Sequence, residues 1–337
     1  MNILVLGGTR FIGPWVVRRL AAGGHGVTVF HRGQNEAELP ASVAHLHGDR
    51  QNLLDFKDAF VRLAPGVVLD LFAMTEADAQ AGVAAFTGLA RRVVVAGSQD
   101  VYRVYDRFLG RDPGPPEPTP FTEQAPLRRH LYPYRAMAPS PDHRFYHYDK
   151  ILVERVYQRV PEMPATVLRL PQVYGPGDYL HRLFPYLKRM DDARPCIPLE
   201  ESQAAWRSAR GYVENVAAAL ALAVEDERAA GKVYNVGEEI ACTEAEWIHR
   251  LGAVTGWAGR VVLLPKLPDV LPSGKDWRHH FVADTRKIRR ELDYREPVAL
   301  DEALRRTIAW ERAHPPENLD PGQFDQAAED ERLRATR

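Results

Sequence analysis

The sequence has little cysteine, no long apolar run and almost no net charge. Its two cysteines, Cys196 and Cys242, are too few for a disulfide framework, so a reducing compartment is the simpler expectation. No apolar run reaches the roughly 18 residues of a membrane-spanning helix, and the N-terminus carries no basic region followed by an apolar signal core. The formal charge of −1 gives no overall field for nucleic acid or an anionic membrane. These absences predict a cytoplasmic protein with neither a membrane nor a nucleic-acid partner.

Short apolar runs alternate with helical segments along much of the 337 residues, 45% of which are hydrophobic. The runs are rich in β-branched residues and apolar on both faces, as in strands buried in a parallel sheet. The alternation predicts an α/β fold of the Rossmann type, in which a doubly wound parallel sheet carries a smaller C-terminal substrate lobe. The expected strands are Ile3–Leu6, Val27–Phe30, Ala44–Leu46, Val67–Phe72, Val93–Ala96, Ala165–Leu170 and Val233–Val236.

A proline-rich segment interrupts this alternation. Residues 110–142 show no clear period, and proline removes backbone donors, so a long irregular loop is expected there. Loops of that length inside a compact domain are more often functional than idle. The expected units are a dinucleotide-binding domain (residues 1–175, its sheet completed by 211–238), a substrate lobe (176–210 and 239–314) and a polar tail (315–337).

A glycine-rich turn stands between the first strand and a helix that opens near Pro14. Such a turn lets the backbone approach a pyrophosphate closely, and the helix N-terminus then supplies unpaired N–H groups. The alternative is a merely structural strand–helix turn, although the context is the one that a dinucleotide fingerprint requires. The expected cofactor contacts are Gly7, Gly8, Thr9, Arg10, Phe11, Ile12 and Gly13, together with Leu71 and Phe72 after the fourth strand.

The end of the second strand lacks the acid that usually holds the ribose hydroxyls of NAD. It reads Phe30-His-Arg-Gly, and Arg32, helped by Arg10, can pair with a 2′-phosphate instead. This favours NADP over NAD. The alternative is that Arg32 is a solvated loop residue stacked on the adenine. Asp49 is placed to accept from the adenine amino group, and its neighbour Arg50 is assigned to the cofactor as well.

Tyr146 and Lys150 stand four residues apart, which puts them on one face of a helix expected to run to about Val160. A phenol of pKa about 10 needs nearby positive charge to act as a base near neutrality. Lys150 and the nicotinamide cation would supply that charge, and both Tyr146 and Lys150 are also expected to contact the cofactor. Ser98, at the polar end of the fifth strand, can hydrogen-bond the same substrate oxygen.

These residues resemble the extended short-chain dehydrogenase/reductases, the NAD-dependent epimerase/dehydratase group, over about residues 1 to 310. The resemblance implies a catalytic triad of Ser98, Tyr146 and Lys150, with Arg210 contacting a substrate pyrophosphate. GGTRFIG itself resembles the branch that includes chloroplast stem-loop-binding proteins. The motifs that carry the likeness are GGTRFIG, SQDVY, Tyr146-x-x-x-Lys150, LRLPQVYGPGD and RGYVENVA.

The sequence departs from the family pattern at several positions. Arg10 replaces the middle glycine, Gln172 replaces the Asn that usually precedes Val-Tyr-Gly-Pro, and the proline-rich insertion lengthens the interval from Ser98 to Tyr146. Where 4,6-dehydratases have Asp-Glu, this chain has Gln99-Asp100, which disfavours dehydration. Asp100 can still be an acid/base, or it merely caps a turn. The expected substrate contacts are Asp100, Gln172 and Arg210.

The leading interpretation is an NAD(P)-dependent epimerase/reductase-type enzyme. It would transfer hydride to or from a hydroxyl or keto group of a sugar-like, nucleotide-linked substrate, and it would form a homodimer. The alternatives are an RNA-binding or nuclease protein on the same fold, and a cofactor-sensing regulator without turnover. The basic run 286–290 could touch RNA, but a solvated helix face is the plainer interpretation.

No metal site is expected. The histidines considered, namely His143, His147 and the pair His279-His280, have no cysteine or carboxylate at ligand spacing.

Overall fold

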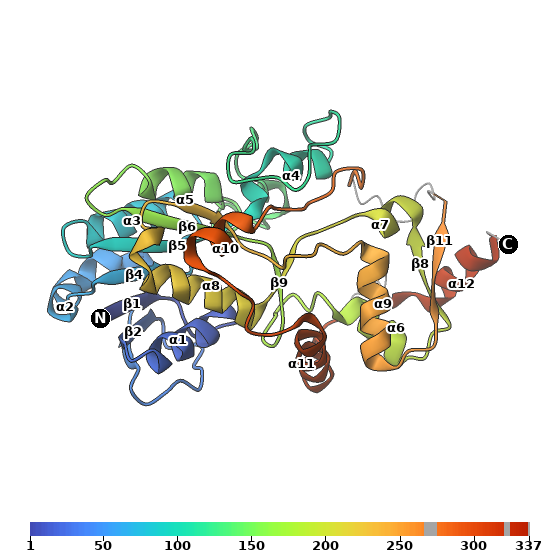
Figure 1. Ribbon diagram of the computed structural model, residues 1–337, viewed down its shortest axis with the longest axis horizontal. Helices are drawn as coiled ribbons and strands as arrows, with labels where there is room; N and C mark the ends of the chain where they lie inside the picture. Colours follow the sequence, from blue (N-terminus) through green and yellow to red (C-terminus); the bar gives the residue numbers. More distant parts are fainter. Residues whose placement is uncertain (266–274, 320–323, 336–337) are drawn as a thin grey trace.

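A seven-stranded parallel sheet forms the centre of the molecule (Figure 1). The computed structural model describes residues 1–265, 275–319 and 324–335. The strand order is β10-β6-β5-β4-β1-β2-β3, and every neighbouring pair is parallel. The expected doubly wound sheet is confirmed, including its two late strands. The strands are β1 (Asn2–Leu6), β2 (Gly26–His31), β3 (Ala44–His47), β4 (Val67–Asp70), β5 (Arg92–Ser98), β6 (Ala165–Leu170) and β10 (Val233–Asn235).

Helices cover both faces of this sheet because the strand side chains are apolar in both directions. In β1, Ile3 and Val5 join one buried cluster, whereas Leu4 and Leu6 join another on the opposite face. Helices α1 (Ile12–Ala22) and α8 (Val213–Glu225) pack together on the first face. On the second face lie η1 (Arg50–Phe56), α2 (Lys57–Leu63), α3 (Glu76–Phe86) and α5 (Lys150–Tyr157).

A smaller lobe lies beyond the carboxyl ends of the strands (Figure 1). Two short parallel pairs occur outside the main sheet, β7 with β9 and β8 with β11. The lobe therefore contains strand–helix alternation that the sequence interpretation did not expect. Its elements and the segments leading into it are β7 (Gln172–Tyr174), α6 (Phe184–Asp191), β8 (Cys196–Glu200), α7 (Glu201–Ala205), β9 (Arg210–Tyr212), α9 (Glu244–Thr255), β11 (Arg260–Leu264), α11 (Leu300–Ala313) and α12 (Gln326–Ala335). Two further helices, η4 (Glu227–Ala229) and α10 (Arg286–Leu292), pack beside β10 at the edge of the main sheet.

The proline-rich segment is irregular, as expected. Helix η2 (Gln99–Val101) and helix α4 (Arg103–Phe108) precede it, and its one helical turn is η3 (Arg135–Met137). Two of its side chains, Phe121 and Arg128, are nevertheless buried, and Tyr134 is half-buried. The segment is therefore anchored to the domain instead of hanging free.

Among the described residues, no helix is both long and apolar enough to cross a membrane.

Candidate functional site

The glycine turn after β1 has the close backbone packing that a pyrophosphate cradle needs. Gly7 and Gly8 adopt φ values of 94° and 105°, a region that L side chains rarely occupy. A Cβ on Gly13 would lie 2.5 Å from the Cα of Gly8, so only glycine fits at that crossing. Phe11 caps helix α1 without a side-chain hydrogen bond. The Gly13 amide donates to the Arg10 carbonyl at 2.9 Å and Pro14 has no N–H, so the Ile12 amide is the one among the first three helical residues that is left for an anion. The cradle therefore fits a dinucleotide.

Aromatic and cationic side chains border this turn. The ring of Tyr179 meets the edge of Phe11 at a centroid distance of 6.3 Å, and the Arg10 guanidinium lies 5.6 Å from the Tyr179 ring. Arg10 is thus stacked against the segment that follows β7. The position of a Gly7 Cβ would be 3.6 Å from the Cβ of Leu71 and 3.8 Å from that of Phe72, so both predicted residues lie beside the cradle.

At the adenosine end, the predicted residues have different environments. Arg32 directly follows β2 and is exposed. Asp49 caps η1, because its carboxylate accepts from the Gln51 amide at 2.9 Å. The Arg50 guanidinium donates to the buried Asp70 carboxylate at 2.7 Å and is therefore already held by an ion pair. Its contact with the cofactor stays a prediction.

Lys150 is buried at the carboxyl edge of the sheet. Its ammonium donates to the carbonyl of Ala96 in β5 at 2.8 Å and to that of Ala73, just beyond β4, at 2.6 Å. Burial lowers the pKa of Lys150, against the nearby carboxylates of Asp70 and Asp100, which raise it. The lysine thus joins helix α5 to the edge where parallel strands bind ligands.

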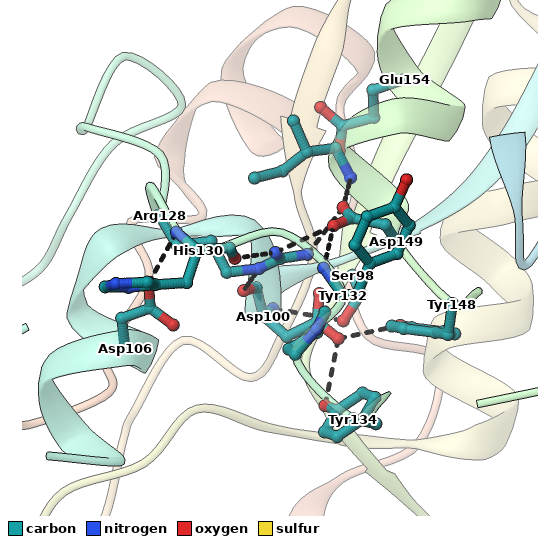
Figure 2. Close-up of polar contacts among 12 residues, drawn as sticks. Ser98, Asp100, Asp106, Arg128, His130, Tyr132, Tyr134, Tyr148, Asp149 and Glu154 are labelled. Atoms are coloured by element: carbon teal, nitrogen blue, oxygen red, sulfur yellow. Dashed lines mark hydrogen bonds and ion pairs between the residues drawn. The ribbon is translucent and has the colours of Figure 1, made fainter. Parts of the chain in front are cut away.

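Asp100 is the centre of a buried hydroxyl network (Figure 2). Its Oδ2 accepts from the hydroxyls of Tyr148 at 2.8 Å and Tyr134 at 3.1 Å, while its backbone amide donates to Ser98 Oγ at 3.2 Å. Asp100 Oδ1 is buried and has no hydrogen-bond partner among the described residues. Burial raises the pKa of Asp100, although Arg128 and the two tyrosines oppose this. This oxygen could accept one more hydrogen bond, and the predicted substrate contact of Asp100 stays a prediction.

The sequence interpretation assigned no role to Tyr148, whose hydroxyl donates to Asp100 in this network. Burial and the Asp100 carboxylate raise its pKa well above the ordinary value, while a hydrogen bond with Ser98 lowers it. The phenol stays protonated near neutrality and acts as a donor. The only signal in the sequence is that Tyr-His-Tyr offers a second tyrosine within one turn of Lys150.

The expected helix from Tyr146 is wrong, because α5 begins at Lys150. Asp149 is its N-cap, and its carboxylate accepts from the Ile151 amide at 2.9 Å. Tyr146 lies in the turn before the cap, with its ring 4.8 Å from the Arg135 guanidinium. Tyr146 and Lys150 are therefore not on one helix face in this structure.

The proline-rich segment explains why the cap falls at this position. Arg128 donates to Asp149 at 2.7 Å, and the Tyr132 amide donates to the same carboxylate at 2.7 Å (Figure 2). Arg128 also donates to the backbone carbonyl of Asp100 at 3.0 Å. The segment thus fixes the start of α5 and brings Tyr134 to the Asp100 network.

The two remaining predicted substrate contacts lie opposite each other. Gln172 in β7 pairs in register with Arg210 in β9, and Gln172 is exposed. Arg210 is buried, forms an ion pair with Glu244 and stacks 4.5 Å from the Trp247 ring. Its charge is therefore already neutralised within the lobe.

Known proteins share both the sequence pattern and the fold. Among curated proteins, 2′-dehydrokanamycin reductase of Streptomyces kanamyceticus is 28% identical over a match covering 68% of this chain and 60% of its own length. The chloroplast stem-loop binding protein of 41 kDa b of Arabidopsis thaliana is 25% identical, with 71% and 59% covered. The matched part spans about three fifths of the length of these relatives.

A solved structure supports the same placement at the level of the fold. UDP-glucose 4-epimerase of Thermotoga maritima, solved with UDP-glucose, has a TM-score of 0.68 at 21% identity, covering 93% of this chain and 99% of that one. The sequence model described as the NAD dependent epimerase/dehydratase family matches residues 3–237, which include the cradle, Ser98 and Lys150. The predicted family is confirmed: the chain belongs to the NAD dependent epimerase/dehydratase family.

Proposed function

We propose that the protein is an NAD(P)-dependent enzyme that transfers hydride at a hydroxyl or keto carbon of a sugar-like, nucleotide-linked substrate. The observation that carries this proposal is the shared sheet edge. The glycine cradle after β1, the buried Lys150 and the Asp100 network after β5 all lie at the carboxyl ends of neighbouring strands. Ligands of doubly wound folds bind at that edge. The similar proteins named 2′-dehydrokanamycin reductase and UDP-glucose 4-epimerase support this proposal.

In this proposal the chain binds the dinucleotide through its N-terminal unit. The backbone of the turn after Gly8 and the Ile12 amide hold the pyrophosphate, and Leu71 and Phe72 line the adjacent wall. Arg32, which is exposed directly after β2, would pair with a 2′-phosphate and so favour NADP. When bound, the nicotinamide supplies the carbon that accepts or returns hydride.

The proton is handled by the chain itself. We assign the acid/base hydroxyl to Tyr146 from the family spacing to Lys150 alone, since the two residues do not share a helix face here. We assign Ser98 to the substrate oxygen. Tyr148 is the second candidate, because its hydroxyl already lies 2.8 Å from Asp100 and beside Ser98. The unsatisfied Asp100 Oδ1 would accept a substrate hydroxyl in either case.

An RNA-binding function remains the opposing candidate, since one relative is named for stem-loop binding. The basic run on α10 does not favour it. Arg286 pairs with Asp284, Arg289 with Glu296, and the Lys287 ammonium donates to a backbone carbonyl. Charges that are paired within the protein contribute little to phosphate contacts.

Turnover with a panel of nucleotide sugars and keto-sugars tests the proposal. We expect at least one substrate to change nicotinamide absorbance, or to be epimerised with no net change in cofactor, as sugar NMR would detect. Cofactor binding with no conversion of any substrate in the panel would favour the alternative of a cofactor-sensing regulator without turnover. Salt-dependent binding of an RNA hairpin without cofactor turnover would favour the RNA-binding function.

A further inference from the structure

Three histidines converge at the edge of the sheet, and the proposed reaction uses none of them. His31 ends β2 and pairs in register with His47, which ends β3. His45 lies two residues before His47, so both side chains leave the same face of the strand. Glu36 comes from the connection between the strands. One ligand atom from each lies within 4.8 Å of the others, and we call this the histidine cluster: His31, Glu36, His45 and His47.

We propose that the histidine cluster binds one divalent transition-metal ion of the zinc class, through three imidazole nitrogens and one carboxylate oxygen. Imidazole and carboxylate are ligands that zinc takes in four-coordinate sites. This site was not considered in the sequence analysis, which expected no metal after weighing His143, His147 and the pair His279-His280 only.

The distances between the ligand atoms suit a tetrahedral ion. With metal–nitrogen bonds of about 2.0–2.1 Å, tetrahedral ligand atoms are about 3.3 Å apart. His31 Nε2 lies 2.9 Å from His45 Nδ1, His45 Nδ1 lies 3.7 Å from Glu36 Oε2, and His47 Nε2 lies 3.5 Å from Glu36 Oε1. These three distances fall on both sides of the tetrahedral value, although the two to Glu36 use different oxygens. The four ligand atoms as a group lie within 4.8 Å of one another, so the more distant ones must move closer together when one ion binds.

The hydrogen bonds of His31 define the proton that metal binding would have to move. The Gly33 amide donates to His31 Nδ1 at 3.2 Å, so the neutral ring carries its proton on Nε2 and donates it to His45 Nδ1. Metal binding would move the His31 proton to Nδ1, and the exposed Gly33 amide would then turn to water.

The position of the cluster also gives it an entry path. Strand β3 is the edge of the seven-stranded sheet, and Glu36, His45 and His47 are all exposed. The connection of residues 32–43 begins and ends beside the cluster, so a bound ion would fix the segment that carries Arg32. An effect of the ion on cofactor binding through Arg32 rests on the proposed function. The metal site itself does not, because it requires no cofactor.

Titration of untagged, chelator-stripped protein with Co²⁺ and then Zn²⁺ tests the site. We expect one ion per chain, a visible Co²⁺ spectrum of the four-coordinate type and its loss when Zn²⁺ displaces it. His45→Gln and His47→Gln should each weaken Zn²⁺ binding at least about tenfold, because even the loss of groups behind a ligand costs 10- to 100-fold.

His249→Gln is the matched control, because His249 is exposed on α9 and outside the cluster. It should bind as the wild type does. Circular dichroism shows whether the two cluster variants and the control variant keep their fold. Absence of stoichiometric uptake by the wild type, or unchanged affinity in both cluster variants, would overturn the proposal. Cofactor is absent from this experiment, so its outcome is independent of whether the enzyme proposal holds.

Discussion

Arg128 and Asp149 form an ion pair at 2.7 Å in which both side chains are fully buried. The arginine belongs to the proline-rich segment, and the aspartate caps the helix that begins with Lys150. The irregular proline-rich segment therefore fixes the residue at which helix α5, and with it Lys150 of the candidate site, begins. Breaking this pair should disturb both stability and the site.

Arg128→Met should lower the free energy of unfolding by about 3–5 kcal/mol, because it leaves the Asp149 charge buried without its partner. Urea unfolding measures the difference. Arg91→Met is the control, since Arg91 pairs with Glu227 at the surface with both side chains mostly exposed, and it should cost less than about 1 kcal/mol. Equal effects of the two substitutions would show that the buried pair does not anchor the segment.

Tyr146→Phe should keep the fold and the cofactor affinity but lower kcat about 10²- to 10⁴-fold, the usual range for a lost acid/base group. Tyr148→Phe is the informative partner, because it removes one donor from Asp100 and leaves Tyr134 in place. We expect the larger loss at Tyr146. If only Tyr148→Phe loses turnover, the acid/base role passes to Tyr148.

Asp100→Asn should become more stable relative to the wild type as pH rises. Burial raises the pKa of Asp100 in the folded chain. Its contribution is therefore fully present below the unfolded pKa of about 4 and is lost as pH rises toward the folded value. The free energy of unfolding, variant minus wild type, should be larger at about pH 7 than at about pH 4 in urea titrations. A difference that is flat or falls with pH would refute this.

Arg32→Ala should weaken NADP binding about 10- to 100-fold, the value of a charge-assisted contact of roughly 1.5–3 kcal/mol, and should leave NAD binding unchanged. Calorimetric titration with both cofactors measures this. Arg159→Ala, which removes an exposed arginine beyond α5, should change neither affinity. Equal wild-type affinities for the two cofactors would remove the proposed preference.

The sheet and its glycine turn could be predicted from the sequence because both are local patterns. Apolar runs such as Ile3–Leu6 and the Gly7–Gly13 spacing carry their meaning within a few residues. The start of α5 could not be predicted in the same way. Helical spacing favoured Tyr146, but Arg128 and the Tyr132 amide reach Asp149 from the preceding loop and fix the cap.

The other contacts that the sequence did not predict arise from the pairing and packing of distant segments. His31 and His47 become neighbours only when β2 pairs with β3, and Cys196 meets Arg260 only when β8 pairs with β11. The ion pair of Arg210 with Glu244 likewise joins two distant segments of the lobe. Contacts of this kind depend on the register of the folded chain, which no local period encodes.

Titration of the purified chain with NADP tests the central claim most directly, with Gly13→Ala and Gly66→Ala as matched variants. A Cβ at Gly13 would lie 2.5 Å from the Gly8 backbone, whereas the nearest atom to a Cβ at Gly66 is 3.6 Å away. The account predicts one site per chain in the wild type and in Gly66→Ala, and its loss in Gly13→Ala. No NADP or NAD binding by the wild type, or undiminished binding by Gly13→Ala, would contradict it.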